Sequence, residues 1–262
     1  MCRFLAYSGQ PTYLEDLVAA PCHSLIHQSM HAEEAKAATN GDGFGLGWYG
    51  DRAEPGVYRE IRPAWSDENL LSIARQVRSR LFFAHVRAAT GTATTRANCH
   101  PFTHGRHLFM HNGQIGGYHL IRRKLDAMLP DHLYSARLGT TDTEALFLLV
   151  MAYIEQGHSP ADAFAAMIGD TVALMAEAGI AEPLRFAAAL TDGETLHAIR
   201  WSSNPKPPSL YICDRGDSIV IASEPVDANR DCWRMMPENS IASVAQATVR
   251  IAPLAVPLKV AA

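Results

Sequence analysis

The first residues of the chain place a cysteine where it could act as a nucleophile. Cys2 follows Met1 directly, so removal of Met1 would leave a thiol and a free α-amine on one residue. Such an amine can act as the base for its own side chain, and the two groups titrate at about 8 and about 8.5. With Met1 attached, the base would be an amide nitrogen, so the hypothesis requires processing. The alternative is an ordinary buried cysteine after the start methionine.

Three other positions carry groups that could bind or activate an amide. Arg87 closes an apolar segment, 80–90, which is typical of a strand covered on both faces. Asn112 and Gly113 follow another apolar segment, and a side-chain amide beside a backbone N–H can form an oxyanion hole. Asp142 lies in the first turn of an expected helix, where the helix dipole favours an anion. A surface role for the arginine and a purely structural role for the aspartate remain alternatives.

A glycine-rich segment, NGDGFGLGWY at 40–49, has glycine at every second position from Gly41 to Gly47. It does not match a phosphate-binding loop, because no Lys-Ser/Thr pair follows and no helical pattern begins. Glycine at alternate strand positions clears one face, so that another backbone or a ligand can approach closely. An ordinary glycine-rich turn into a strand is the alternative.

The composition argues against several classes of protein. The chain has 262 residues, of which 48% are hydrophobic, enough for one large core or two modest ones. Acidic and basic residues are interspersed and the net charge is −4, so we expect no basic patch that would bind nucleic acid or a membrane surface. The start does not resemble a secretory signal, and the longest apolar run, 145–154, is shorter than the ~20 residues that span a bilayer. We therefore expect a soluble, cytoplasmic protein.

Cysteines and histidines form no recognised metal or disulfide pattern. The five cysteines are odd in number and include no CxxC pair, which predicts a reducing compartment and no disulfide framework. Several histidines lie close together, at 85, 100, 104, 107 and 111. A metal site is a rival hypothesis, but nearby carboxylate or cysteine ligands and a helical HExxH pattern are absent. We predict no metal, and we expect His100 to fix a loop by hydrogen bonding.

The remaining pattern predicts one α+β domain with layered sheets and outer helices. Strands are expected at 3–8, 80–90, 108–111, 184–190, 195–201, 210–213, 218–222 and 241–251. Helices are expected at 69–78 after a Ser66 N-cap, at 114–129, at 145–156 and from Pro160 to Gly179. Thr141 and Glu144 fit a capping box. Gly9-Gln10-Pro11 and Asn112-Gly113 are expected to end strands, and Asp192-Gly193 to form a hairpin turn.

Several segments follow one another in the order of a known family. They are Cys2, NGDGFGLGWY at 40–49, AHVRAAT at 84–90, NCHPF at 98–102, HNG at 111–113 and TDTE at 141–144. Together they resemble the class II glutamine amidotransferases, which are N-terminal-nucleophile hydrolases. ASEPVD at 222–227, with Trp233 after it, is similar to the stand-alone branch that includes the γ-glutamyl hydrolase of ergothioneine synthesis. The resemblance covers the whole chain. It implies a single glutamine amidotransferase domain over 1–262, folded as a four-layer αββα sandwich of antiparallel sheets.

The resemblance also implies roles for the candidate residues. Cys2 would be the nucleophile, with its own amine as general base. The Asn112 side chain and the Gly113 N–H would hold the oxyanion. Arg87 would bind the substrate α-carboxylate, a planar match that lysine does not reproduce. Asp142 would pair with the α-ammonium, and Thr90 would add a hydrogen bond nearby.

The implied reaction has two steps and needs no cofactor. The thiolate attacks the side-chain amide of glutamine or another γ-glutamyl amide, ammonia or an amine leaves, and water hydrolyses the γ-glutamyl thioester. Ala88 stands where sugar-aminating members carry a tryptophan that couples to a synthase domain, and no acceptor domain is expected in this chain. Ammonia would therefore go to a separate synthase subunit, or the enzyme would be a plain hydrolase.

Two other functions stay open at this level. One is a non-catalytic binding or scaffold protein that keeps the fold, although the matched polar residues argue against it. The other is hydrolysis of a non-glutamyl amide such as a β-lactam or a bile-acid conjugate. Arg87 together with Asp142 favours an amino-acid substrate over these.

Overall fold

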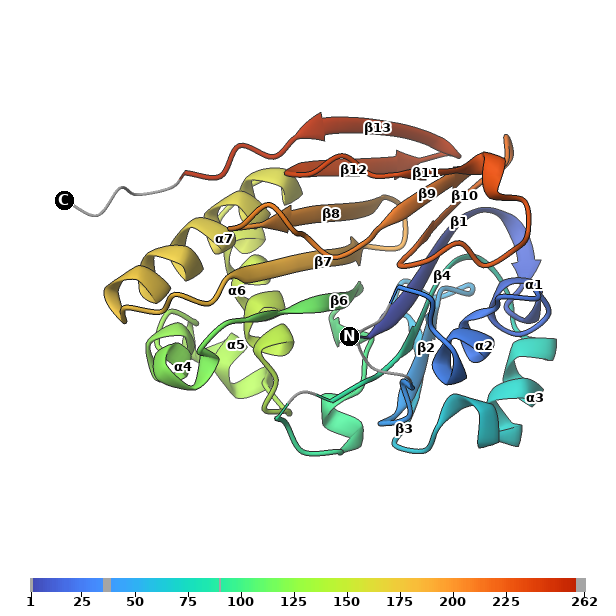
Figure 1. Cartoon of the computed structure of the whole chain (residues 1–262), viewed down its shortest axis with the longest axis horizontal. Helices are drawn as coiled ribbons and strands as arrows, with labels where there is room; N and C mark the ends of the chain where they lie inside the picture. The colour runs from blue at the N-terminus through green and yellow to red at the C-terminus, as the bar shows by residue number, and fades with distance from the viewer. Residues whose placement is uncertain (1, 35–38, 90, 258–262) are drawn as a thin grey trace.

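Two antiparallel sheets form the centre of the protein, as the computed structural model shows for residues 2–34, 39–89 and 91–257 (Figure 1). In spatial order, the strands of sheet A are β11 (Trp233–Met235), β9 (Tyr211–Asp214), β10 (Ser218–Ala222), β1 (Arg3–Tyr13), β4 (Arg78–Val86), β2 (Phe44–Trp48) and β3 (Gly56–Glu60). Those of sheet B are β13 (Thr248–Pro253), β12 (Ser240–Ala245), β8 (Leu196–Ser202), β7 (Leu184–Thr191), β6 (His107–Ile115) and β5 (Phe102–His104).

Helices cover the outer face of each sheet. Sheet A packs against α1 (Glu15–Val18), α2 (Leu25–Met30) and α3 (Glu68–Gln76). Sheet B packs against α4 (Tyr118–Asp126), α5 (Asp131–Ala136), α6 (Asp142–Glu155) and α7 (Pro160–Glu177), which lie together at one side of Figure 1. The layers are thus helix, sheet, sheet, helix, which confirms the predicted α+β architecture with two antiparallel sheets.

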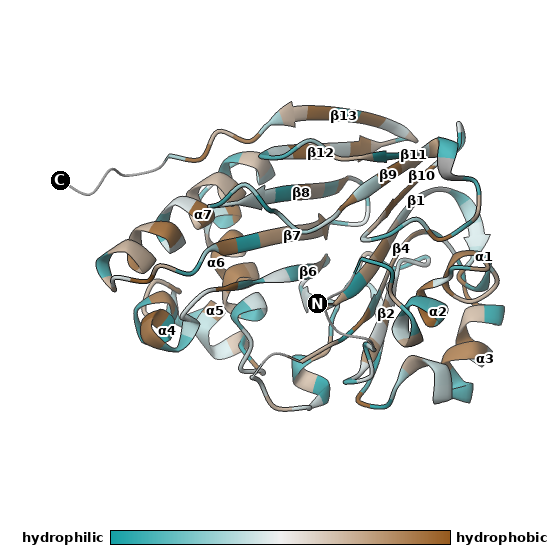
Figure 2. Ribbon diagram, viewed as in Figure 1, coloured by the Kyte–Doolittle hydropathy of each residue, from teal (hydrophilic) through white to brown (hydrophobic). Residues whose placement is uncertain are grey.

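The period of two along each strand explains how the layers hold together. On β1, Phe4 and Ala6 face sheet B and join the core between the sheets, whereas Leu5 and Tyr7 face the helices that cover sheet A. Such strands are buried on both sides and therefore apolar throughout, and Figure 2 shows brown, hydrophobic residues along the central strands and along α6 and α7. The start of β1 is consequently held in a packed layer.

The helix starts follow the expected capping chemistry with two differences. Thr141 caps α6 by accepting a hydrogen bond from the Glu144 N–H at 3.2 Å. The Glu144 carboxylate does not complete the predicted box, because it accepts from the N–H groups of Leu138 and Gly139 instead. The N-cap of α3 is Asp67 and not Ser66, since Asp67 Oδ1 accepts from the Leu70 N–H at 2.8 Å.

Three of the predicted strand limits are wrong. β1 does not end at Gly9-Gln10-Pro11 but continues to Tyr13, with a register shift between Ser8 and Thr12. β6 does not end before Asn112-Gly113, because both residues pair with β7. The expected single strand over 241–251 is a hairpin of β12 and β13, whose turn is formed by Gln246 and Ala247 at positive φ. The helix expected at 114–129 begins only at Tyr118.

The glycine-rich segment has the close backbone approach that its pattern predicts. A Cβ on Gly45 of β2 would lie 2.1 Å from the His100 carbonyl oxygen, and one on Gly47 would lie 2.8 Å from Pro101 Cγ. The NCHPF segment therefore packs directly on the cleared face of β2.

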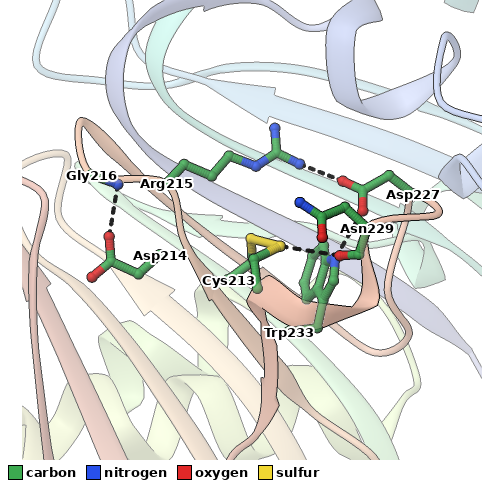
Figure 3. The surroundings of a disulfide bond; sticks show 8 residues. Cys213, Asp214, Arg215, Gly216, Asp227, Asn229 and Trp233 are labelled. Atoms are coloured by element: carbon green, nitrogen blue, oxygen red, sulfur yellow. Dashed lines mark hydrogen bonds and ion pairs between the residues drawn. A yellow bond between two sulfur atoms is a disulfide. The ribbon is translucent and has the colours of Figure 1, made fainter.

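One disulfide contradicts the prediction from cysteine spacing. Cys213 and Cys232 are bonded, with their Cα atoms 5.1 Å apart, because β11 pairs with β9 so that Trp233 lies opposite Cys213 (Figure 3). Asp227 accepts from the Trp233 indole N–H and pairs with Arg215 beside this bond. None of the helices in the described residues has the length and apolarity needed to cross a membrane.

Candidate active site

Strand alternation brings three predicted site residues to the space between the two sheets. Cys2 precedes Phe4 by two positions, Arg87 follows Phe83 by four, and Asn112 follows Met110 by two. Phe4, Phe83 and Met110 all belong to the core between the sheets. β1 and β4 also contact β6 across this core (Figure 1). Because residues two apart on a strand share a face, Asn112 faces this layer, and Cys2 and Arg87, each one residue beyond a strand end, continue the same alternation.

Cys2 lies beside the segment that follows β4. Its Sγ is 3.4 Å from the Ala88 N–H and 3.5 Å from the Ala88 carbonyl oxygen. Burial raises the pKa of the Cys2 thiol, while the Ala88 hydrogen bond and the charges of Arg87 and Arg3 oppose that shift. The thiol is therefore protonated at neutral pH and needs a base to act as a nucleophile. Met1, and with it the question of its removal, lies outside the described residues.

Arg87 is buried, not a surface arginine, and its guanidinium is held from two sides. It donates from Nη1 to the Asp42 carbonyl at 3.2 Å, and from Nη2 to Thr92 Oγ1 at 2.7 Å and to the Ala93 carbonyl at 3.3 Å. Asp42 Oδ2 accepts in turn from the Ala89 N–H at 2.8 Å. The guanidinium orientation is thereby fixed beside Cys2.

Asn112 is buried on β6, and neither its Nδ2 nor its Oδ1 has a hydrogen-bond partner among the described residues. Nearly all buried amides in folded proteins are hydrogen-bonded, so this amide calls for an explanation. Gly113 has φ +155, and a Cβ there would lie 1.9 Å from the Arg185 carbonyl oxygen on β7. Only glycine therefore fits beside the unpaired amide.

Asp142 begins α6 next to the end of β6. Its Oδ2 accepts from the Ile115 N–H at 3.0 Å and its Oδ1 from the Thr143 N–H at 2.8 Å. It is partly exposed. The carboxylate is thus held by backbone donors, while its remaining lone pairs can accept from a substrate ammonium.

Asn98 joins the loop that holds Arg87 to the loop that precedes Asp142, and the sequence did not single it out. It is buried, donates to the Ala93 carbonyl at 2.8 Å and accepts from the Thr140 N–H at 2.8 Å. Ala93 O is the same oxygen that Arg87 contacts. Asn98 therefore links the loops that hold Arg87 and Asp142, the two residues that form the predicted substrate clamp. Thr90, the remaining predicted binding residue, lies outside the described residues.

The histidines near the site form no metal centre in the residues that the structure describes, where no group of three or more His, Cys, Asp and Glu side chains is arranged to bind an ion. His85 and His100 stack with ring centroids 3.9 Å apart, and neither ring is hydrogen-bonded within the described chain. His100 is therefore not the hydrogen-bonding residue that we expected. Burial lowers the pKa of His85 to about 3 and that of His100 well below its usual value, so both rings are neutral.

Comparison with known proteins agrees with this geometry. The family model of class-II glutamine amidotransferases matches residues 1–215. This chain belongs to that family. It is 32% identical to a probable glutamine amidotransferase of Saccharomyces cerevisiae over 97% of this chain and 84% of that protein. It is also 32% identical to the γ-glutamyl-hercynylcysteine sulfoxide hydrolase of Mycolicibacterium smegmatis over 97% of this chain and all of that protein.

Solved structures give the same assignment. A glutamine aminotransferase class-II domain protein from Silicibacter pomeroyi superposes with a TM-score of 0.77 at 34% identity, over 97% of this chain and all of that chain. The glutamine phosphoribosylpyrophosphate amidotransferase of B. subtilis superposes with a TM-score of 0.63 at 15% identity, over 98% of this chain and half of that one. The second likeness concerns the fold alone.

Proposed function

We propose that this amidotransferase-family chain hydrolyses the side-chain amide of glutamine or of another γ-glutamyl compound through a thioester on Cys2. The observation that carries the proposal is the buried Asn112 amide, which has no partner in the described chain and faces the same layer as Cys2. An amide donor kept free beside a nucleophile is what stabilisation of an oxyanion requires.

In the first step Cys2 Sγ attacks the amide carbon. With Met1 removed, the α-amine of Cys2 takes the thiol proton, and the Asn112 side chain and the Gly113 N–H stabilise the oxyanion. The carbon–nitrogen bond then breaks, and the departing ammonia or amine takes its proton from the α-ammonium. In the second step the same amine removes a proton from water, which hydrolyses the γ-glutamyl thioester to free carboxylate and thiol.

Arg87 and Asp142 bind the amino-acid end of the substrate. The α-carboxylate accepts from the Arg87 guanidinium, and the α-ammonium donates to Asp142, where the N-terminus of α6 already favours negative charge. These two charges of opposite sign match a zwitterionic amino-acid group and exclude amides that lack such a group.

The leaving amine is the less constrained part of the substrate. Ala88 is the residue whose backbone contacts Cys2 Sγ, and its methyl group leaves more space near the thiol than a large side chain would. One relative is named as a γ-glutamyl-hercynylcysteine sulfoxide hydrolase, so its named substrate is a γ-glutamyl compound larger than glutamine. We therefore favour hydrolysis of a substituted γ-glutamyl amide over donation of ammonia to a separate synthase subunit.

The test is a panel of glutamine and substituted γ-glutamyl amides incubated with wild-type protein and with Cys2→Ser. We expect release of glutamate from at least one compound, loss of turnover in Cys2→Ser, and a wild-type mass that lacks Met1. Cys22→Ser is the matched control, since Cys22 is an exposed free cysteine and should not affect turnover.

Other outcomes would refute the proposal in identifiable ways. No glutamate release by a folded protein across the panel would favour a scaffold role. Activity lost to a chelator and retained in Cys2→Ser would favour metal catalysis. Active protein that retains Met1 would remove the proposed base.

A further inference from the structure

Glu224 lies within the ASEPVD segment, directly after β10, and its carboxylate is almost completely buried. Four donors from three separate segments reach it. Oε1 accepts from Arg3 Nε at 2.5 Å and from the Glu34 N–H at 2.9 Å, and Oε2 accepts from the Glu33 N–H at 3.0 Å and from His23 Nε2 at 3.1 Å. One carboxylate therefore joins the N-terminal strand, the turn before α2 and the loop after α2.

The contact with Arg3 leads directly to the nucleophile. Arg3 donates from Nη1 to the Cys2 carbonyl oxygen at 2.9 Å. Ser223, the residue before Glu224, exchanges two hydrogen bonds with Phe4, from the Phe4 N–H to Ser223 Oγ and from the Ser223 N–H to the Phe4 carbonyl. The 223–224 segment thus holds the Cys2 carbonyl, through Arg3, and the backbone of Phe4.

Electrostatic interactions keep the Glu224 carboxylate ionised. Burial opposes ionisation of Glu224, but the Arg3 guanidinium and the backbone and histidine donors lower the pKa of its carboxyl below its usual value. A buried ion pair is weak evidence for stability, because its desolvation cost is large and an apolar replacement is often equally stable. A buried charge pair next to Cys2 therefore points to a demand for fixed geometry.

We propose that Glu224 is a positioning residue that fixes the Cys2 backbone through Arg3, an inference that rests on the proposed thioester chemistry. Glu224 touches no reacting atom. It holds the Cys2 peptide so that the thiol and the α-amine keep the orientation needed for attack. Misplacement of a nucleophile by about 1 Å can cost about 100-fold in rate, so loss of this anchor should lower kcat and leave KM nearly unchanged.

The experiment compares Glu224→Gln with the double variant Arg3→Met/Glu224→Gln. The single variant leaves the Arg3 charge buried without its partner, and we expect a lower melting temperature and a kcat reduced by about 10- to 100-fold. The double variant removes both charges, so stability should recover. We expect its kcat to stay low, because nothing then holds the Cys2 carbonyl.

Asp67→Ala is the matched control for destabilisation, because it removes the N-cap acceptor of α3. Asp67 is a buried carboxylate that accepts from the Leu70 N–H and the Tyr58 hydroxyl, on the far side of sheet A from the core between the sheets. This variant should lower the melting temperature without changing kcat.

Two results would overturn the proposal. One is a kcat that recovers together with stability in the double variant, which would make the ion pair merely structural. The other is an Asp67→Ala variant that loses kcat as Glu224→Gln does. Failure of the proposed function itself is distinguishable, because the wild type would then turn over no γ-glutamyl amide.

Discussion

Substitution of Arg87 by lysine tests the substrate clamp most directly. A guanidinium has five N–H donors. Three of them bond within the described chain, to Asp42 O, Thr92 Oγ1 and Ala93 O. Two N–H groups, one on Nε and one on Nη1, therefore remain without a bond in the described chain and could donate to a substrate carboxylate.

Lysine cannot serve both purposes. Its ammonium has only three donors at a single point, so it must give up contacts with the loop or with the substrate. A hydrogen bond to a charged group contributes about 1.5–3 kcal/mol. Loss of one such bond corresponds to a decrease of about 10- to 150-fold in kcat/KM.

The decrease should appear in KM. The α-carboxylate is remote from the scissile amide, so the contact stabilises ground state and transition state alike, and kcat should change little. The assay is steady-state glutamate release from the best compound of the γ-glutamyl panel, with the melting temperature measured on the same samples. Arg106→Lys serves as control, because Arg106 is an exposed arginine that contacts Asp192 and Glu194 in the β7–β8 turn.

Two outcomes would refute the clamp. An unchanged KM in folded Arg87→Lys would show that Arg87 does not bind substrate. A full reproduction of the effect by Thr92→Ala, which removes only the loop contact, would show that Arg87 acts by ordering the 92–93 segment.

Three further predictions concern the surroundings of the site. Asn98→Ala should raise KM and lower stability by about 1–3 kcal/mol for each backbone group left unsatisfied, and unchanged substrate kinetics would argue against the link between the clamp halves. Because burial raises the pKa of the Cys2 thiol, the thiol stays protonated and depends on the free α-amine as its base, so kcat/KM should rise through the ordinary range of that amine near about pH 8; a plateau already reached below neutral pH would contradict this. The double variant Cys213→Ser/Cys232→Ser opens a loop with a sequence separation of 19 and should lose about 3 kcal/mol in denaturant unfolding. An unchanged midpoint would show that the bond adds no stability.

Local patterns predicted most of the strands because burial on both faces leaves continuous apolar runs, as in β4 and β7. They failed where tertiary pairing overrides a turn signal. Asn112-Gly113 is a strong turn dipeptide, yet β7 supplies partners for both residues and the strand continues. The turn between β12 and β13 has the opposite problem, since Gln246 and Ala247 adopt positive φ without any glycine to signal it.

The residues of the candidate site also fall into two groups, those that the sequence predicted and those that it did not. Cys2, Arg87, Asn112 and Asp142 were predicted because their types suit a known chemistry at recognisable motifs. The Arg3–Glu224 pair was not, because its partners are 221 residues apart in the chain. Neither residue type indicates a contact until β1 pairs with β10 and brings the segment after β10 to the start of β1.

Hydrogen-bond satisfaction separates two kinds of buried polar residue near Cys2. Glu224 accepts from four protein donors, so hydrogen bonds within the protein account for its burial. Its role is to hold the Cys2 backbone in place. The Asn112 amide has no partner in the described chain, and a buried polar group left unsatisfied costs about 1–3 kcal/mol. Folding alone gives no reason to keep that cost, whereas an oxyanion formed at Cys2 would repay it only during the reaction. The free amide is therefore expected to act on the transition state, and Asn112→Ala should lower kcat without loss of stability.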